Sequence, residues 1–589
     1  MKKKVTKVCH DFKNLFCPSK NNGINDCSLS PNKFDDDGGG GGGGGEGGGG
    51  EMKTDWRSIL ISNIVAFLGS VTMSSITPTV WPYMKKIDVT TTENLYGFIR
   101  GLYAFGNVIF SMLSGWLSNK ASDTRPAMII GKFITILAAL AYLFVEVFQS
   151  FHVVLFIAFE FLLGTSSGIC SVFRTHIAMA STEADRSKAF GITQLATASG
   201  FVVGPLLQVI FSQISYPGIS LFAGTHFNLY TAPIVLAAST SIIGIILLFC
   251  CFDGRMKVKD TPTPIYTEDV ALGTVDEDLF LETAPTKKTA KVINDDGKPK
   301  YDIIAVIVVI IVKLSTEIVI LNLITICPPY AMTAFQWSSE DTIIFQSAIM
   351  GSIGILSISF ALAYVFFKLG KRIKERTALS VALFLFLSFH IITYPWGFWS
   401  ERIQYQHVKG TIAPANLSMA LDPSLRALVA ESQKPGSKIE IVGCNPAFEW
   451  CEKTPKVNIV VFNAALIIAL GIGFPLIQIN LDILYSKVLG PIKQGTLQGI
   501  YNATGQALNI VGPLAFSQMY TSYGPRILWG LEIGVCSIAI IIFLFFYPRM
   551  IPWSERVAEI KTTKPVQICQ TKTTTASAPA KNIIKIVNN

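Results

Sequence analysis

Charge is scarce in this chain of 589 residues: Asp, Glu, Lys and Arg make up 15% of it, whereas soluble proteins carry about 25%. Half of the residues are hydrophobic. No cluster of ligands has metal-binding spacing, no nucleophile accompanies a base, and no nucleotide-binding loop occurs. The sequence therefore argues against a soluble protein and against an enzyme, and it predicts no cofactor and no metal site.

The chain is rich instead in apolar runs of about 20 residues, the length that crosses the hydrocarbon of a bilayer. Six runs precede a polar gap and six follow it, which predicts an all-α membrane protein of twelve transmembrane helices in two six-helix halves. Two runs are diluted by Ser, Thr, Gly and Gln (95–118 and 189–214), as expected for helices that line a polar cavity. The predicted spans are 57–80, 95–118, 126–147, 152–179, 189–214, 227–252, 302–333, 341–367, 377–398, 457–484, 495–519 and 526–547.

The polar segments divide the chain further. Low complexity and high polarity predict disordered tails and a disordered linker between the halves. No cleavable signal peptide is visible, because the first hydrophobic run begins near Arg57. The predicted divisions are a tail with a glycine tract (1–55), the first half (56–252), the linker (253–301), the second half (302–547) and a second tail (548–589).

Lys and Arg gather in alternate loops, and such loops favour the cytosolic side of a membrane. With twelve spans, both termini are then cytosolic too. The net charge of +9 follows largely from this bias, so it requires no nucleic-acid partner. The predicted cytosolic loops hold Lys120 and Arg125, Arg186 and Lys188, the cations of 368–376, and Lys487 and Lys493.

Residues 399–456 form the only sizeable polar insertion on the predicted luminal side. Asn416-Leu417-Ser418 is a glycosylation sequon in this loop. Cys444 and Cys451 flank the turn-forming Pro446, and the lumen is oxidising. The loop therefore predicts glycosylation at Asn416 and a Cys444–Cys451 disulfide, with two free thiols as the alternative.

Two stretches repeat one pattern 308 residues apart. Gly191-Ile192-Thr193-Gln194 runs on to Gly204-Pro205, and Gly499-Ile500-Tyr501-Asn502 runs on to Gly512-Pro513. Glycine lets helices approach closely, and proline kinks a helix. A repeat between two membrane-embedded halves is typical of a carrier in which one half rocks against the other. The residues expected to serve this movement are Gly115, Arg174, Gly200, Gly204, Pro205, Gly512 and Pro513.

Motifs in the first half carry a family resemblance. Trp81-Pro82-Tyr83 ends the first span, Gly115-Trp116-Leu117-Ser118-Asn119-Lys120 leads to Arg125-Pro126, and Leu162-Leu163-Gly164 lies in the fourth span. Together they resemble the major facilitator superfamily and, within it, an endolysosomal subgroup associated with a neuronal ceroid lipofuscinosis. The resemblance implies a twelve-helix carrier fold in the late endosomal or lysosomal membrane, and it implies chloride conduction as one activity.

Two positions depart from the superfamily's pattern. Asn119 replaces the acid of its Gly-x-x-x-Asp-Arg/Lys motif, and Glu160 stands where an arginine usually precedes the Leu-Leu-Gly of the fourth helix. An acid in place of a base could reverse a local preference for anions. Chloride is therefore not carried over directly.

Ionisable side chains at membrane depth are costly, so each is a functional candidate. Lys313 and Glu317 stand four residues apart on one face of the seventh span. The two form either a structural ion pair or a coupling element that a proton or substrate can break. A midplane site between the halves is where carriers place such an element.

Other ionisable candidates are more isolated in the sequence. Glu160 has no local partner and is either a proton or cation acceptor or a structural acid, while Arg100 is weighed equally between a functional and a structural role. We expect Arg174 to snorkel to lipid headgroups from the end of its span. We expect structural roles for Asp482 and a packed position for His390.

Three functions fit these patterns. The first is a secondary carrier that moves a small solute or ion through the bilayer, with protons or chloride as candidate ions. The second is an anion channel on the same fold. The third is a transport-inactive receptor or scaffold, against which the Gly-Pro kinks and the buried charges argue.

Glycosylation at Asn416 gives the first test. Asn416→Gln should speed gel migration as much as enzymatic removal of the glycan does, because one oligosaccharide is lost in either case. Unchanged migration of the variant would contradict the use of this site or the predicted topology.

Overall fold

Asp55 and Asp302 begin the first helix of each half. The Asp55 carboxylate accepts a hydrogen bond from the backbone N–H of Ser58 at 3.1 Å, and Asp302 accepts those of Ile304 and Ala305 at 2.9 and 3.2 Å. Such caps satisfy amide donors that the first turn of a helix leaves free. The two helices that follow are each 32 residues long, more than a bilayer requires.

The computed structural model describes residues 54–88, 91, 93–214, 216–221, 224–256, 301–432 and 440–562. Most of both predicted tails and of the linker lies outside the described residues. The first half comprises α2 (Trp56–Ile87), α3 (Glu93–Ala121), α4 (Arg125–Leu143), η1 (Gln149–Phe151), α5 (His152–Cys170), α6 (Phe173–Ala180), α7 (Arg186–Phe211), β1 (Ile219–Ser220), β2 (His226–Phe227) and α8 (Ala232–Cys250).

The second half is longer because of its polar insertion. It comprises α9 (Ile303–Ala334), α10 (Ser339–Phe366), α11 (Leu369–Arg372), α12 (Glu375–Ile392), β3 (His407–Val408), α13 (Leu417–Ala420), α14 (Pro423–Ser432), β4 (Ile441–Val442), α15 (Ile459–Ile468), the π-helical η3 (Ala469–Gly473), α16 (Phe474–Leu489) and α17 (Gly495–Phe545). Then follow η4 (Tyr547–Arg549) and α18 (Trp553–Thr562). Each pair of short strands, β1 with β2 and β3 with β4, is antiparallel.

Ten helical stretches among the described residues are long and apolar enough to cross a membrane. Two features account for the difference from the twelve predicted spans. α17 contains two spans, because Gly524 has a φ of +75° and Pro525 follows it. α3 is long enough but too polar, since buried Asn107, Ser111 and Ser114 face other helices. With α3 and both parts of α17 counted, the predicted fold class is confirmed.

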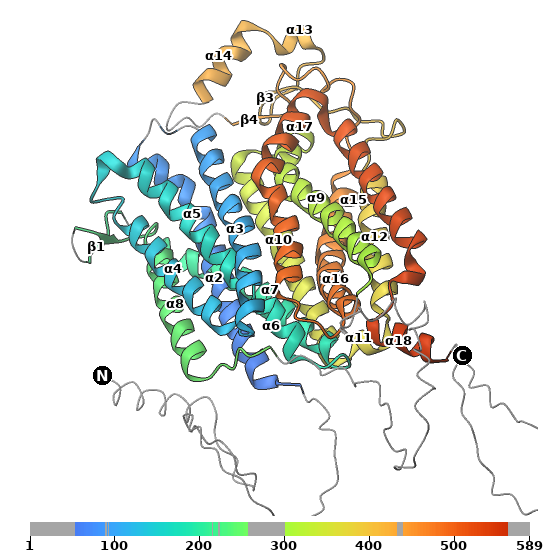
Figure 1. Ribbon diagram of the computed structural model, residues 1–589. Coiled ribbons are helices and arrows are strands. Elements are labelled where there is room, and N and C mark those ends of the chain that lie inside the picture. The colour runs from blue at the N-terminus through green and yellow to red at the C-terminus, as the bar shows by residue number, and fades with distance from the viewer. Residues whose placement is uncertain are drawn as a thin grey trace, which may run out of the picture.

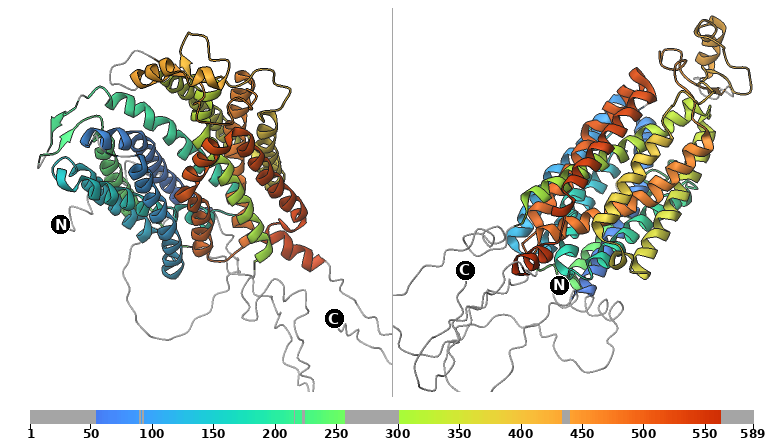
Figure 2. Two further views of the ribbon diagram at one scale, coloured as in Figure 1. Left: turned by 90° about the horizontal axis from the view of Figure 1, so that it is seen from above. Right: turned by 90° about the vertical axis from the view of Figure 1, so that its right-hand side faces the viewer.

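The two halves stand side by side (Figure 1). We call the end of the bundle that carries the connections 122–124, 181–185 and 490–494 the basic face. Lys and Arg residues stand within these connections or at the helix ends beside them: Lys120, Arg125, Arg186, Lys188, Lys487 and Lys493. We call the opposite end, which carries 399–456, the loop face. The right-hand view of Figure 2 shows the orange segment of the loop face beyond the ends of the helices.

The loop-face segment contains both features that the sequence singled out. A disulfide joins Cys444 and Cys451, whose Cα atoms are 6.1 Å apart. Asn416 is exposed, and its side chain caps α13 by accepting a hydrogen bond from the N–H of Met419 at 3.1 Å. Glycosylation of Asn416 stays a prediction.

The chain beyond the last span is not a disordered tail from its first residue, so this prediction was wrong for residues up to 562. Arg549 and Arg556 both contact Oδ2 of Asp302, at 3.1 and 2.8 Å. Burial alone would raise the pKa of Asp302, but the N–H of Ala305 and the two guanidinium groups outweigh it and lower this pKa. Ser554 of α18 donates to Glu183 of the first half at 2.8 Å. Long-range contacts hold α18, which its composition does not reveal.

The start of the predicted linker is also ordered. The N–H of Thr124 donates to the carbonyl of Gly254 at 2.9 Å, and that of Met256 donates to Ser122 at 2.9 Å. Met256 is buried. The first half therefore ends at least four residues later than the sequence predicts, because 253–256 pack against the start of α4.

Glycines bring helices of the first half into backbone contact. A Cβ added at Gly204 of α7 would lie 1.9 Å from Ser74 Oγ and 2.8 Å from the carbonyl oxygen of Val71 in α2. At the equivalent Gly512 of α17, a Cβ would meet Cδ2 of Leu321 at 2.5 Å. Backbone cannot yield as a flexible leucine can, so the two glycines of the repeat differ in what they tolerate.

We expect Gly204→Ala to destabilise the protein by about 1–3 kcal/mol, the usual range for overpacking. Gly512→Ala, the matched control, should lose less, because Leu321 can change rotamer. The melting temperature of purified protein in detergent measures both effects. Equal losses in the two variants would contradict this account of the repeat.

Candidate functional site

One turn of α9 places Lys313 and Glu317 on the same face, as the sequence predicts. Lys313 Nζ lies 2.5 Å from Glu317 Oε1, and both side chains are largely buried. Gln478 of α16 joins them: its Oε1 accepts from Lys313 Nζ at 3.1 Å, and its Nε2 donates to Glu317 Oε1 at 3.3 Å. The two charges are thus neutralised within one network that links α9 to α16.

The first part of α17 covers this network. A Cβ at Gly505 would lie 3.2 Å from Lys313 Cε and 3.3 Å from Glu317 Cγ, so the helix backbone packs directly on the pair. Lys313 Nζ also lies 5.4 Å from the centre of the Tyr501 ring. The hydroxyl of Tyr501 then donates to Asp482 Oδ1 at 3.0 Å. Tyr501 therefore connects the charged pair to a second charged group.

Asp482 forms an ion pair between the two halves. Its Oδ2 lies 3.0 Å from NH1 of Arg174, which α6 carries in the first half. We predicted that Arg174 snorkels to headgroups, and this was wrong because its partner comes from a helix that local sequence does not reveal. The Arg174–Asp482 pair continues the network from Lys313 across the interface between the halves.

Asn119 fastens the end of α3 to the start of α17. Its Oδ1 accepts from the N–H of Gly495 at 2.7 Å, while its Nδ2 donates to the carbonyl of Lys493 at 3.2 Å and to Thr496 Oγ1 at 2.9 Å. The amide thus caps a helix start. Beside it, a Cβ at Gly115 would lie 2.3 Å from the carbonyl oxygen of Gly495. Only glycine permits this approach.

The halves are joined near the basic face. Between described residues of the two halves, every hydrogen bond and ion pair lies in the half of the bundle nearest that face. The pairs are Ser111–Gly499, Asn119 with Lys493, Gly495 and Thr496, Ser122–Lys493, Arg174–Asp482, Asp185–Lys371 and Glu183–Ser554. The structure thus shows the basic face closed.

A second ion pair lies wholly inside the first half. Arg100 NH1 of α3 is 3.2 Å from each oxygen of Glu160 on α5, and Glu160 is fully buried. Glu160 has no partner nearby in the sequence, because Arg100 precedes it by 60 residues. The guanidinium carbon also lies 5.2 Å from the ring centre of Tyr103. The structure joins the four predicted charges in two separate pairs.

Glu532 and Lys132 are ionisable side chains inside predicted apolar runs that were not among the candidates. Glu532 of α17 is fully buried, and Lys132 of α4 is 8% exposed with its alkyl chain against Gly244. Lys313 was selected because an ionisable side chain at membrane depth is costly, and the same reason would have selected both of these residues. His390, expected to be packed, is buried with its Nδ1 2.8 Å from the carbonyl oxygen of Phe386. No group of three potential metal ligands occurs within the described ranges.

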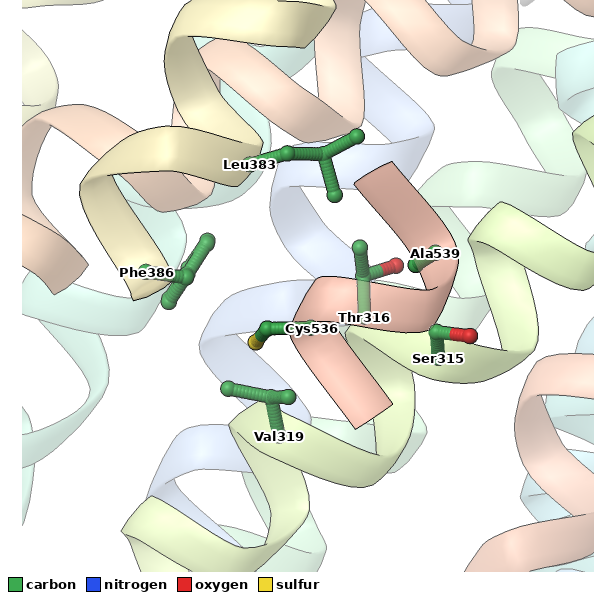
Figure 3. Close-up of a pocket in the computed structure, with 7 residues that line it drawn as sticks. All are labelled: Ser315, Thr316, Val319, Leu383, Phe386, Cys536 and Ala539. Carbon is green, nitrogen blue, oxygen red and sulfur yellow. The ribbon is translucent and has the colours of Figure 1, made fainter. Parts of the chain in front are cut away.

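A small pocket lies within the second half, between α9, α12 and the second part of α17 (Figure 3). Its lining is mostly apolar. Seven residues line it: Ser315, Thr316, Val319, Leu383, Phe386, Cys536 and Ala539. The pocket does not include the Lys313–Glu317 pair.

Comparison with known proteins places this geometry in a family. The family model described as Major Facilitator Superfamily matches residues 62–408. The chain is also 26% identical over 508 residues to Major facilitator superfamily domain-containing protein 8 of Xenopus laevis. The alignment covers 86% of this chain and 94% of the relative.

Solved structures share the fold. The human organic anion transporter MFSD10 (TETRAN) is 14% identical with a TM-score of 0.52, and the aligned residues make up 83% of this chain and 99% of the transporter's chain. The proton:xylose symporter XylE is 13% identical with a TM-score of 0.54, covering 86% and 99%. A bacterial homologue of the iron transporter ferroportin is 12% identical with a TM-score of 0.51, covering 85% and 100%.

We expect Asp482→Asn to weaken closure of the basic face, because it removes an ion pair of roughly 1–3 kcal/mol, between exposed and buried pairs in strength. Cysteines at Ser122 and Lys493, whose Oγ and Nζ atoms are 2.6 Å apart, would measure closure through a bifunctional thiol reagent about as long as the lysine side chain that it replaces. The yield should fall in Asp482→Asn.

Two further variants serve as controls. Glu401→Gln removes the exposed Lys456–Glu401 pair of the loop face and should leave the cross-linking yield unchanged. Exchanging the charges, Arg174→Asp with Asp482→Arg, should restore part of the yield. An undiminished yield in Asp482→Asn would remove this pair from the closure of the basic face.

Proposed function

The chain belongs to the Major Facilitator Superfamily, and on this premise we propose that it is a secondary active transporter that moves a small solute or ion across the endolysosomal membrane. Alternating access requires a contact that closes one face and a site between the halves that senses it. The observation that carries the proposal is the network from Lys313 and Glu317 through Tyr501 to the Arg174–Asp482 pair.

In this proposal Glu317 is the coupling acid. Protonation of Glu317 would remove the ionic attraction that holds Lys313 and leave a cation facing Tyr501 and Gln478. The closure of the basic face by Asp482 would then be coupled to the protonation of Glu317, because only Lys313 and Tyr501 stand between these two acids in the network. Conversely, opening that face would alter the affinity of Glu317 for its proton, since such coupling is reciprocal. The Arg100–Glu160 pair is the second candidate for coupling.

The orientation is part of the proposal. The Lys and Arg residues of the basic face support a cytosolic position, with both termini on that side. The sequon at Asn416 and the Cys444–Cys451 disulfide support a luminal loop face. The endolysosomal membrane is proposed from the subgroup motifs and from the similarity to the Xenopus relative.

An anion channel on the same fold is the alternative. Lys313 and Arg174 are both cations beside the interface between the halves, which favours an anionic cargo. Flux against voltage separates the two functions. A channel current reverses at the equilibrium potential of the ion, whereas a coupled carrier follows the combined gradients.

The test is flux and current in vesicles with purified protein, across a small panel of anions and at two pH gradients. If Glu317 carries protons, Glu317→Gln should fold and retain downhill flux but lose its dependence on pH. The double variant Lys313→Ala, Glu317→Ala should then stay defective.

A purely structural pair gives the opposite pattern. Each single alanine variant would lower expression, because one charge is left unpaired, and the double variant would recover expression and transport. Full pH-driven transport by Glu317→Gln would exclude Glu317 from coupling. Absence of any flux in the wild type would contradict the carrier itself.

A further inference from the structure

A second acid, Glu532, lies in the interior of the second half, apart from the network at the interface. Its residue is fully buried. The only hydrogen bond that reaches its carboxyl group from the described residues comes from Nδ2 of Asn322, which lies 2.9 Å from Oε1. Oε2 of Glu532 and Oδ1 of Asn322 are both buried and have no partner.

These two orphan atoms are complementary if the acid is protonated. An ionised carboxylate only accepts hydrogen bonds, whereas a carboxylic acid also donates one. With a proton on Oε2, Glu532 gains a donor, and the atom of the same side-chain pair that lacks a donor is Asn322 Oδ1. One proton would thus supply what both side chains need, while an ionised Glu532 would leave a buried charge with a single neutral partner.

The surroundings offer no cation to neutralise the acid. On α9, Lys313 precedes Asn322 by nine residues, about 13 Å along the helix axis, and is already paired with Glu317. On α12, the buried titratable side chain is His390, and its Nδ1 lies 2.8 Å from the carbonyl oxygen of Phe386. On α17 itself the neighbour one turn away is the buried thiol of Cys536. None of the ion pairs between described residues includes Glu532.

The acid lies between an aromatic layer and the pocket. Toward the loop face, Trp529 packs on Tyr330 and Phe462, with ring centres 5.3 and 6.3 Å apart. Toward the basic face, about one turn along the helices that carry Asn322 and Glu532, Val319 and Cys536 line the pocket in Figure 3. The pocket therefore begins about one turn from the acid, on the side of the basic face.

We propose that Glu532 is a proton-binding site, which holds a proton at neutral pH while the basic face is closed. Its use in transport rests on the proposed carrier function. Its existence rests on the burial of Glu532, its single neutral partner and the two complementary orphan atoms.

Infrared spectroscopy of the purified full-length protein tests the site. The wild type at neutral pH should show the C=O stretching band of a buried carboxylic acid, and the band should fade as the pH is raised. E532Q, which imitates the protonated shape, should fold with an unchanged melting temperature and lose this band. The matched control E317Q should keep it, because Glu317 is paired with Lys313. A band of equal intensity in E532Q would overturn the proposal.

A second measurement needs no variant. A hydrophobic carbodiimide reacts with a protonated carboxyl group: the O–H adds across a C=N bond, its proton passes to nitrogen, and the adduct is found by mass spectrometry. An adduct on Glu532 at neutral pH that is lost at alkaline pH supports the site, and its absence at both pH values overturns it. Flux by the wild type tests the carrier separately, so a transport-silent protein with the acid band would overturn the carrier alone.

Discussion

A charge within hydrocarbon must find a partner, because a lone one costs roughly 2.5–3.5 kcal/mol on insertion scales. The bundle meets this constraint with one ion pair within a helix, Lys313 with Glu317, and two between helices, Arg100 with Glu160 and Arg174 with Asp482. The Arg100–Glu160 and Arg174–Asp482 pairs also fix which helices must be neighbours. The charges therefore specify the arrangement of the helices more strictly than the apolar residues, which pack against many surfaces equally well.

A contact can be predicted from the sequence when its two residues stand close together along the chain. The Lys313–Glu317 pair was predictable, because a helix places residues four apart on one face. The partners of Glu160 and Arg174 were not, since they stand 60 and 308 residues away. The twelve-helix fold follows from apolar runs, but α18 escaped prediction because its stability comes from Asp302 and Glu183 rather than from its own composition.

The position of Tyr501 explains how a proton on Glu317 could influence whether the basic face is closed. Its ring lies beside Lys313, while its hydroxyl bonds Asp482, the acid that pairs with Arg174. A single rigid side chain thus contacts both the proposed coupling pair and Asp482, whose pair with Arg174 is one of the contacts that join the halves. A change at either end needs to travel only through one residue, and a shift of a few kcal/mol is enough to change which state is populated.

The Arg174–Asp482 pair has a consequence for the history of the chain. The repeated stretches 191–205 and 499–513 are offset by 308 residues, and Arg174 and Asp482, each 17 residues before the first glycine of its stretch, are offset by the same number. Equivalent residues that touch each other lie on the pseudo-twofold axis of the two halves. A residue kept identical in both copies would there meet its own duplicate, and two like charges would repel. An ancestor with identical residues at both positions could not have held this pair, so divergence there was a condition for closing the basic face with this particular ion pair.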